Sequence, residues 1–242
     1  REESGKNYLL DLGVNKKNIY VLGDPVFGMK VQKNIERVNT IIKTNKINLL
    51  DKPTIGVSFR HEYWKGNETQ YFNINLKLAR LLDEISDILD CQYLFIPNCT
   101  YAHGHKWQDD RVTHRDIVNR MKNKKIAFNI EERLSVYDTF RLFNLLDIHI
   151  SNRRHSCIFA AMNNVPFLTI NVSLEGHLSP LLKELNVPNQ LASLDDMKNF
   201  KKKILKTWKN KDNLSKSLKP KVGKLNKLSQ KHVATILDNI SW

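Results

Sequence analysis

The 242-residue chain lacks any long hydrophobic run. No stretch approaches the ~20 consecutive apolar residues that a helix needs to cross a bilayer, and no charged-then-apolar leader opens the chain. Hydrophobic residues still make up 41% of the sequence, enough for one good core or two small ones. We therefore expect a globular, cytoplasmic protein, with peripheral contact at a membrane left open.

Cysteine is scarce. Cys91, Cys99 and Cys157 are an odd number without paired spacing, so a disulfide framework is not expected. Cys99 is followed closely by His103 and His105, but no second pair of ligands accompanies this group, as a zinc site would require. The sequence thus predicts no metal site, and these residues are interpreted as loop positions near a strand end.

Acidic residues are nearly absent from the C-terminal segment 198–231. Nearly every charged residue there is lysine, Asp212 is the only acid, and the net charge of the whole chain is +14. Apolar residues recur among the lysines at the spacing of amphipathic helices that pack on a larger body. The lysine face is then either solvated, which is the usual case, or a contact for anionic lipid or an acidic polymer, each lysine adding ~1 kcal/mol near a charged bilayer.

Nucleic acid is not among the expected partners, despite the positive charge. The lysines lack the aromatic stacking platform on which single strands bind. No helix-turn-helix or zinc-finger pattern is present either.

Strand-like and helix-like segments alternate along the chain. Short apolar runs predict strands at 19–22, 54–59, 93–96 and 126–130, and one on each side of a central turn at 151–155. Helical spacing predicts helices at 1–14, 34–50 (with an irregular end), 74–89, 114–121 and 134–146. Such alternation is typical of parallel βαβ units. We predict an α/β fold in three parts: a leading helix, strand and connecting helix (1–50), a main lobe (51–190) and lysine-rich helices packed on it (191–242).

The central turn concentrates charge between an apolar strand and a small-residue helix. It carries Arg153, Arg154 and His155, and Val165 and Pro166 then introduce the next strand. In an open parallel sheet, ligands bind beyond the carboxyl ends of the strands, where helix N-termini offer N–H groups to anions. The three charged side chains are expected in such a crevice, although spacing alone is equally compatible with a solvated basic turn.

Five short motifs follow one another along the chain. They are Arg1-Glu2-Glu3-Ser4 with the apolar run 9–14, the Asp-Pro loop 23–27, the strand 55–60 with Trp64, Gln108-Asp109-Asp110, and 151–155 followed by Ile158-Phe159-Ala160 and Val165-Pro166. In residue types and in order they resemble the motifs of the polysaccharide pyruvyl transferase family, over roughly Arg1 to Val187. The resemblance implies a two-lobed fold like that of GT-B glycosyltransferases. This chain would supply the Rossmann-like C-terminal lobe and a hinge-proximal helix, with an N-terminal lobe upstream of Arg1.

The resemblance further implies transfer of a pyruvyl group from phosphoenolpyruvate to sugar hydroxyls of a polysaccharide or glycan, leaving a ketal and phosphate. Phosphoenolpyruvate would be a co-substrate, and no cofactor is implied. The donor's carboxylate and phosphate require fixed cations, and the planar fork of arginine suits both anions. Arg153 is the first candidate and Arg1 the second. Arg60 and Ser4 are weaker ones, because a strand-end arginine is often plain surface and Ser4 is expected to cap the first helix.

His155 is the candidate general acid and base. Protonating the donor's methylene carbon and deprotonating the attacking hydroxyls require a group that titrates near neutrality. The alternative is a histidine that only binds a carbonyl of the turn. Asp109 and Asp110 are expected to orient an arginine or contact the acceptor, unless they only complement a helix dipole.

Two positions depart from the family pattern. Many relatives carry a tyrosine and a lysine after the Val-Pro strand, where this chain has Asn171 and His177. His177 is expected to contact the acceptor or support the site, with a weaker charge than lysine at neutral pH, so acceptor choice or activity is open. Two other functions stay open as well. One is a nucleotide-sugar glycosyltransferase, with Glu175 near the ribose, and the other is a non-catalytic relative that binds an anionic surface.

Overall fold

The computed structural model describes residues 2–61, 68–101, 108–171 and 178–239. Its strands form one six-stranded sheet in the order β3-β2-β1-β4-β5-β6, and every neighbouring pair is parallel. The strands are β1 (Thr54–Ser58), β2 (Gln92–Phe95), β3 (Ala127–Asn129), β4 (Ile148–Ser151), β5 (Phe167–Asn171) and β6 (Leu191–Ser193). This is the strand order of a doubly wound Rossmann sheet, so the predicted fold class is confirmed.

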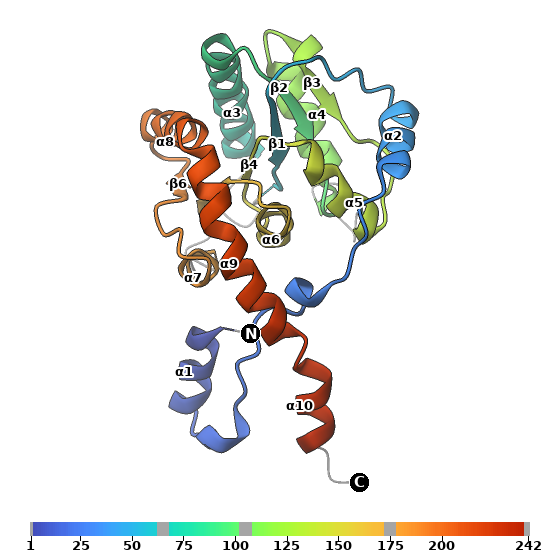
Figure 1. Cartoon of the computed structure of the whole chain (residues 1–242). Coiled ribbons are helices and arrows are strands. Elements are labelled where there is room, and N and C mark those ends of the chain that lie inside the picture. The colour runs from blue at the N-terminus through green and yellow to red at the C-terminus, as the bar shows by residue number, and fades with distance from the viewer. Residues whose placement is uncertain (1, 62–67, 102–107, 172–177, 240–242) are drawn as a thin grey trace.

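Helices cover both faces of the sheet (Figure 1). The α-helices are α1 (Glu3–Asp11), α2 (Ile35–Thr44), α3 (Glu68–Leu89), α4 (Asp110–Arg120), α5 (Val136–Leu142), α6 (Arg154–Met162), α7 (Ser179–Glu184), α8 (Met197–Lys209), α9 (Lys211–Ser229) and α10 (His232–Asn239). Short 3-10 turns are η1 (Lys16–Asn18), η2 (Pro25–Gly28), η5 (Lys124–Ile126) and η6 (Phe143–Leu145). Helices α3, α4 and α8 pack on one face, and α5, α6 and α9 on the other.

The alternation of side chains along β4 shows how the two layers are separated. Ile148 and Ile150 belong to the α3 side of the core, whereas His149 packs edge-on against Phe143 on the opposite side. Gly56 of β1 leaves room for this histidine. A Cβ atom there would lie 2.6 Å from His149 Nδ1 and 2.3 Å from a Leu146 methyl carbon, too close for any side chain.

The N-terminal segment differs from the prediction at one point. α1 ends as expected, with Gly13 at φ +84°, but the predicted strand 19–22 is wrong, because this segment does not join the sheet. Its neighbours are C-terminal helices instead. Tyr20 Oη donates to Asn239 Oδ1 at 2.8 Å, and Ser229 Oγ donates to the Asp24 carbonyl at 2.7 Å. As a result α1 and α10 extend away from the sheet at the same end of the molecule (Figure 1).

Other boundaries shift by a few residues. α3 begins six residues before its predicted start and α4 four residues before, and the sequence does not predict the three-residue β6. The lysine-rich helices pack on the sheet as expected, since Phe200 and Ile204 of α8 and Leu218 and Leu225 of α9 are buried in the core. No helix in the described part of the chain is both long and apolar enough to span a membrane.

Candidate active site

A pocket of about 470 Å³ lies at the carboxyl ends of β1 and β4. From this central pair the sheet extends through β2 and β3 on one side and through β5 and β6 on the other. Ligands of open α/β sheets bind in the crevice that such a switch point creates. The lining residues are Val26, Arg60, Asn98, Leu134, Val136, Thr139, Asn152, Arg153, Arg154, His155 and Phe159. The turn after β4 therefore supplies 152–155, as the sequence predicts.

Side chains tie this turn to the end of β1. Asn152 Oδ1 accepts the Arg60 N–H at 2.9 Å, and Asn152 Nδ2 donates to the Arg60 carbonyl at 3.0 Å. Ser151 Oγ donates to the Ser58 carbonyl at 2.8 Å and accepts the Arg153 N–H at 2.8 Å. The two strand ends thus form one unit before any ligand binds, which is the preorganisation that a binding site requires.

Arg153 is oriented by a buried acid on α4. Its guanidinium reaches both carboxylate oxygens of Asp110, through Nε at 3.1 Å and through Nη2. Asp110 is fully buried and also accepts the backbone N–H groups of Asn98 at 2.9 Å and Cys99 at 3.0 Å. Burial raises the pKa of the Asp110 carboxyl, and Arg153 and the two N–H groups oppose that rise. Among the described residues, none accepts a hydrogen bond from Arg153 Nη1, and the Arg153 side chain lines the pocket.

Arg154 and His155 share a different carboxylate, that of Asp24. Asp24 Oδ2 lies 3.6 Å from Arg154 Nε and 3.8 Å from His155 Nε2. The Arg154 side chain is only 6% exposed, and its Nη1 lies 3.6 Å from Glu2 Oε1, so it is packed among acids. The His155 side chain, in contrast, is 52% exposed. Of the two neighbours, His155 is the one that reaches solvent.

A second histidine lies buried behind the end of β1. His114 Nε2 accepts the Phe59 N–H at 3.1 Å, and its ring packs 5.3 Å from that of Phe95. Burial first, and then the positive charge of Arg153, lower the pKa of His114 to about 3. His114 is therefore neutral at pH 7 and holds the backbone at 59 without adding charge to the site.

The two neighbouring acids at 109 and 110 play different parts. Asp110 orients an arginine, which is one of the roles predicted for this pair. Asp109 caps α4 by accepting the Arg111 N–H at 3.0 Å and pairs with the Arg111 side chain at 2.6 Å. Its side chain thus complements the helix N-terminus rather than lining the pocket.

The remaining predicted residues lie elsewhere. Ser4 is exposed on α1 and does not line the pocket, and its predicted capping role is wrong, because the residue at the cap position is Glu2. Outside the described residues are Arg1, Trp64, His103, His105, Glu175 and His177, together with the side chain of Asn171. The donor-binding roles of Arg1 and Ser4 and the acceptor role of His177 stay predictions.

Three residues that shape the site are not singled out by sequence reasoning. Asp24 could have been found, because it stands in the Asp-Pro loop, and Asn152, because it directly precedes Arg153. His114 carries no such signal, since a lone histidine in a helix is unremarkable until its neighbours are known. In the described part of the chain no three His, Cys, Asp or Glu side chains are arranged to hold a metal ion. The site thus offers an oriented guanidinium beside an accessible imidazole.

Comparison with known families identifies the fold that carries this pocket. The family model described as polysaccharide pyruvyl transferase matches residues 1–173. The chain belongs to this family. The matched range contains α1, the Asp-Pro loop and strands β1 to β5, and therefore every residue that lines the pocket. No protein of curated function is significantly similar in sequence.

Solved structures with the same fold include enzymes of sugar metabolism. UDP-GlcNAc 2-epimerase from Neisseria meningitidis, bound to UDP-GlcNAc, is 15% identical with a TM-score of 0.57, covering 98% of this chain and 60% of that one. The epimerase from Methanocaldococcus jannaschii is 14% identical (TM-score 0.54, 98% and 60%). A trehalose-phosphate synthase from Burkholderia xenovorans is 15% identical (TM-score 0.56, 84% and 46%). The chain thus spans about half to three fifths of their length, and the likeness shows one Rossmann-like lobe of the GT-B architecture.

Proposed function

We propose that this pyruvyl transferase family member moves a pyruvyl group from phosphoenolpyruvate to two hydroxyls of a sugar in a polysaccharide or glycan. Both hydroxyl oxygens become bonded to C2 of the donor, and the bond from C2 to the phosphate oxygen breaks. One hydroxyl proton ends on the methylene carbon, which becomes a methyl group, and the other leaves with inorganic phosphate. The product is a cyclic ketal that carries a carboxylate.

The geometry of Arg153 is the observation that carries the proposal. Asp110 holds the guanidinium through Nε and Nη2, so the side chain that lines the pocket is already ordered before a ligand binds. Arg60 lines the same pocket from the end of β1. Two arginines are suited to a small ligand that carries both a carboxylate and a phosphate.

His155 is proposed as the group that transfers protons. It is half exposed at the pocket, and its Nε2 lies 3.8 Å from the Asp24 carboxylate, which orients the imidazole. A general acid–base group of this kind contributes about 10² to 10⁴ in rate. Asp24 acts through the imidazole and is therefore a positioning residue.

The size and apolar wall of the pocket leave room for an acceptor. A volume of about 470 Å³ exceeds what phosphoenolpyruvate fills and lies in the usual range for ligand pockets. Val26, Leu134 and Phe159 add apolar side chains to the lining of the pocket. These side chains suit the C–H face of a sugar ring and the methyl group of the new ketal.

Calorimetric titration of phosphoenolpyruvate into the chain at low salt and pH 7 tests the proposal. Saturable binding that Arg153→Ala abolishes supports it, and Arg115→Ala, which changes a surface arginine paired with Glu131, is the matched control. UDP-GlcNAc is the second titrant, because two of the similar structures are named for it. Binding of UDP-GlcNAc alone would instead favour glycosyl transfer. Donor binding without ketal formation by any sugar acceptor would favour a non-catalytic relative.

The exposed lysines of α9 support a second, separate proposal, peripheral contact with an anionic membrane. Lys216, Lys219, Lys224 and Lys227 are all exposed, on the side of α9 opposite the buried Leu218 and Leu225. Each adds roughly 1 kcal/mol near an anionic bilayer. Sedimentation with phosphatidylserine vesicles should fall for Lys219→Gln/Lys224→Gln. Equal sedimentation with neutral phosphatidylcholine vesicles would contradict the proposal.

A further inference from the structure

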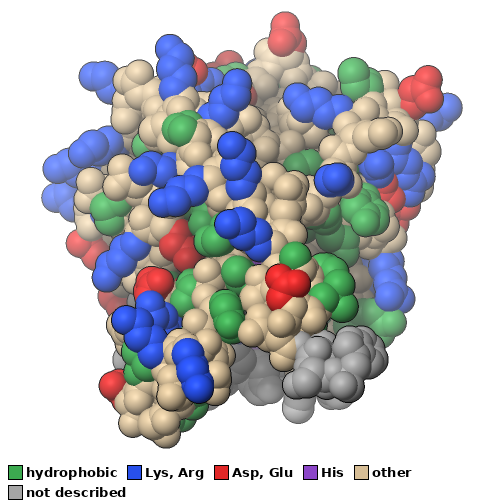
Figure 2. Space-filling view, turned by 60° about the horizontal axis from the view of Figure 1, so that its bottom comes forward, with side chains coloured by type: hydrophobic (Ala, Val, Ile, Leu, Met, Phe, Trp, Pro, Cys, Tyr) green, Lys and Arg blue, Asp and Glu red, His purple; other side chains and the backbone are tan. Residues whose placement is uncertain are grey.

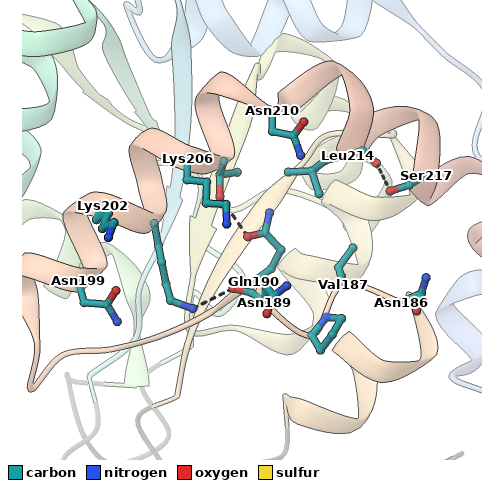
Figure 3. A pocket seen from close by; sticks show the side chains of 13 residues that line it. Asn186, Val187, Asn189, Gln190, Asn199, Lys202, Lys206, Asn210, Leu214 and Ser217 are labelled. Carbon is teal, nitrogen blue, oxygen red and sulfur yellow. Dashed lines mark hydrogen bonds between the residues drawn. The ribbon is translucent and has the colours of Figure 1, made fainter.

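A second pocket lies at the opposite end of the sheet. It has a volume of about 530 Å³ and is enclosed by α8, α9 and the segment 186–190, which leads into β6 (Figure 3). Because 186–190 precede β6, this pocket is at the amino end of a parallel strand. The candidate active site is at the carboxyl ends, so the two pockets share no residue.

Among the described residues, the lining of the second pocket contains no carboxylate. Its members are lysines (Lys202, Lys203, Lys206), amides (Asn186, Asn189, Gln190, Asn199, Asn210), hydroxyls (Thr207, Ser217) and apolar side chains (Val187, Pro188, Leu214). Figure 2 shows basic side chains over most of the face that it draws, with acidic ones scattered among them. Positive charge alone therefore does not identify a binding site on this molecule. This pocket is distinguished by lysines and amides that surround a hollow with no acid among its described lining residues.

Two lysines of the pocket have no acidic partner among the described residues. Lys202 and Lys206 lie one turn apart on the exposed side of α8, and neither forms an ion pair with a described residue. Elsewhere on α8, Lys201 pairs with Glu84 at 2.8 Å. Like charges at this spacing on a helix repel each other, so an anion bound between them would relieve the repulsion. Lys203 Nζ donates to the Asn189 carbonyl at 3.0 Å and fixes the rim.

The floor of the pocket is rigid. Thr207 Oγ1 donates to Gln190 Oε1 at 3.1 Å in a buried contact between α8 and the loop. The Gln190 carbonyl accepts the Thr169 N–H of β5 at 2.9 Å, which ties the loop to the sheet. Asn199 and Lys202 lie at one end of the hollow, and Leu214 at the other (Figure 3). The polar groups thus project from fixed elements around a preformed space.

We infer that this second pocket binds an acidic carbohydrate. Each amide side chain offers both a donor and an acceptor, which is what sugar hydroxyls require, while Lys202 and Lys206 suit a carboxylate or phosphate on the same sugar. The inference rests on the proposed function, since a polymer held here would raise the local concentration of acceptor at the other end of the sheet. The pyruvyl ketal itself adds such a carboxylate to the glycan.

Titration with defined saccharides tests the inference without any phosphoenolpyruvate. The probes are trigalacturonate, glucose 1-phosphate and neutral maltotriose. Lys202→Gln/Lys206→Gln should weaken binding of the acidic probes at least tenfold. The matched control Lys124→Gln/Lys125→Gln removes two exposed lysines at the β3 edge of the sheet and should change binding less than twofold. Equal losses in the two double variants, or no saturable binding of either acidic probe, would overturn the inference.

Two further measurements separate the possible outcomes. Preference for trigalacturonate over glucose 1-phosphate identifies a carboxylated glycan, and the reverse identifies a phosphorylated one. If neutral maltotriose binds as tightly as the two acidic probes, the lysines do not recognise negative charge and the inference is overturned. Arg153→Ala should leave binding of the acidic probes unchanged while it abolishes phosphoenolpyruvate binding, so failure of the proposed function and failure of this inference are distinguishable.

Discussion

The two pockets of the sheet present positive charge by different means. At the carboxyl ends, Arg153 is clamped by the buried Asp110 and presents one end of a rigid fork. At the amino end, Lys202 and Lys206 stand on the exposed side of one helix, and no acid of the described part of the chain pairs with them. A clamped guanidinium selects a ligand by geometry, whereas mobile ammonium groups select by charge. The first arrangement suits a small reacting molecule and the second suits a variable stretch of polymer.

Support from the surrounding structure differs in the same way. The first pocket joins the ends of two strands through Asn152 and Ser151, and it receives Asp24 from a loop that α9 holds in place. A change in any of these elements is expected to reach the turn 152–155. The second pocket rests mainly on the contact between Gln190 and Thr207, so its lysines can change without disturbing the fold.

Substitution of the exposed histidine should have the largest effect and would separate chemistry from binding. His155→Gln keeps a polar side chain at the pocket but removes the group proposed to transfer protons. We expect kcat for ketal formation to fall about 10² to 10⁴-fold, with the Kd for phosphoenolpyruvate nearly unchanged. Rate and calorimetric measurements on the same preparation check this. A fall in affinity with kcat unchanged would assign His155 to binding instead.

Removal of the buried carboxylate charge should destabilise the first pocket strongly. Asp110→Asn keeps the size of the side chain but leaves the Arg153 guanidinium without its counter-charge. Breaking a buried pair in this way costs about 3–5 kcal/mol, which urea unfolding would measure. Asp109→Asn is the matched control, because asparagine caps a helix as well as aspartate does. If both variants lose equal stability, Asp110 is not the clamp that the geometry indicates.

The central turn could be predicted from sequence because its signal is local. Arg153 and His155 stand in one short polar segment between an apolar strand and a small-residue helix, and parallel sheets bind ligands at that point. The supporting residues come from distant parts of the chain. His114 reaches the site only through the packing of α4, which no short pattern encodes. Asp24 stands in the recognisable Asp-Pro loop, but its place beside the turn depends on the packing of that loop against α9.

The failed strand prediction has the same cause. The segment 19–22 has the apolar character of a strand, but strand formation requires a partner, and Tyr20 finds one in α10 instead of the sheet. β6 was missed for the opposite reason, since three residues are too few to show alternation, yet Gln190 places them beside β5. Tertiary contacts thus determine whether each of these two segments forms a strand.

Low pH should lower the free energy of unfolding through two buried histidines on the side of the first pocket. The described lining of the second pocket contains no histidine. Burial lowers the pKa of both His114 and His149 to about 3 in the folded chain, compared with about 6.5 when unfolded. Only the unfolded state binds these protons, so stability is full above pH 6.5 and falls as the pH drops toward 3. The slope approaches about 1.4 kcal/mol per pH unit for each histidine. His149→Leu should remove one histidine's share between pH 6 and 4 in urea unfolding, and unchanged slopes would contradict this.

The smallest effect is expected when arginine and lysine replace each other in the two pockets. Arg153→Lys keeps the positive charge but cannot reach both Asp110 oxygens and an anion from one plane, so the Kd for phosphoenolpyruvate should rise about tenfold, or roughly 1.4 kcal/mol. Lys206→Arg also keeps the charge, and at a site that selects by charge it should change affinity for trigalacturonate less than twofold. If the lysine exchange proves as costly as the arginine exchange, the second pocket also recognises geometry, and its ligand must be a defined sugar rather than any acidic stretch of polymer.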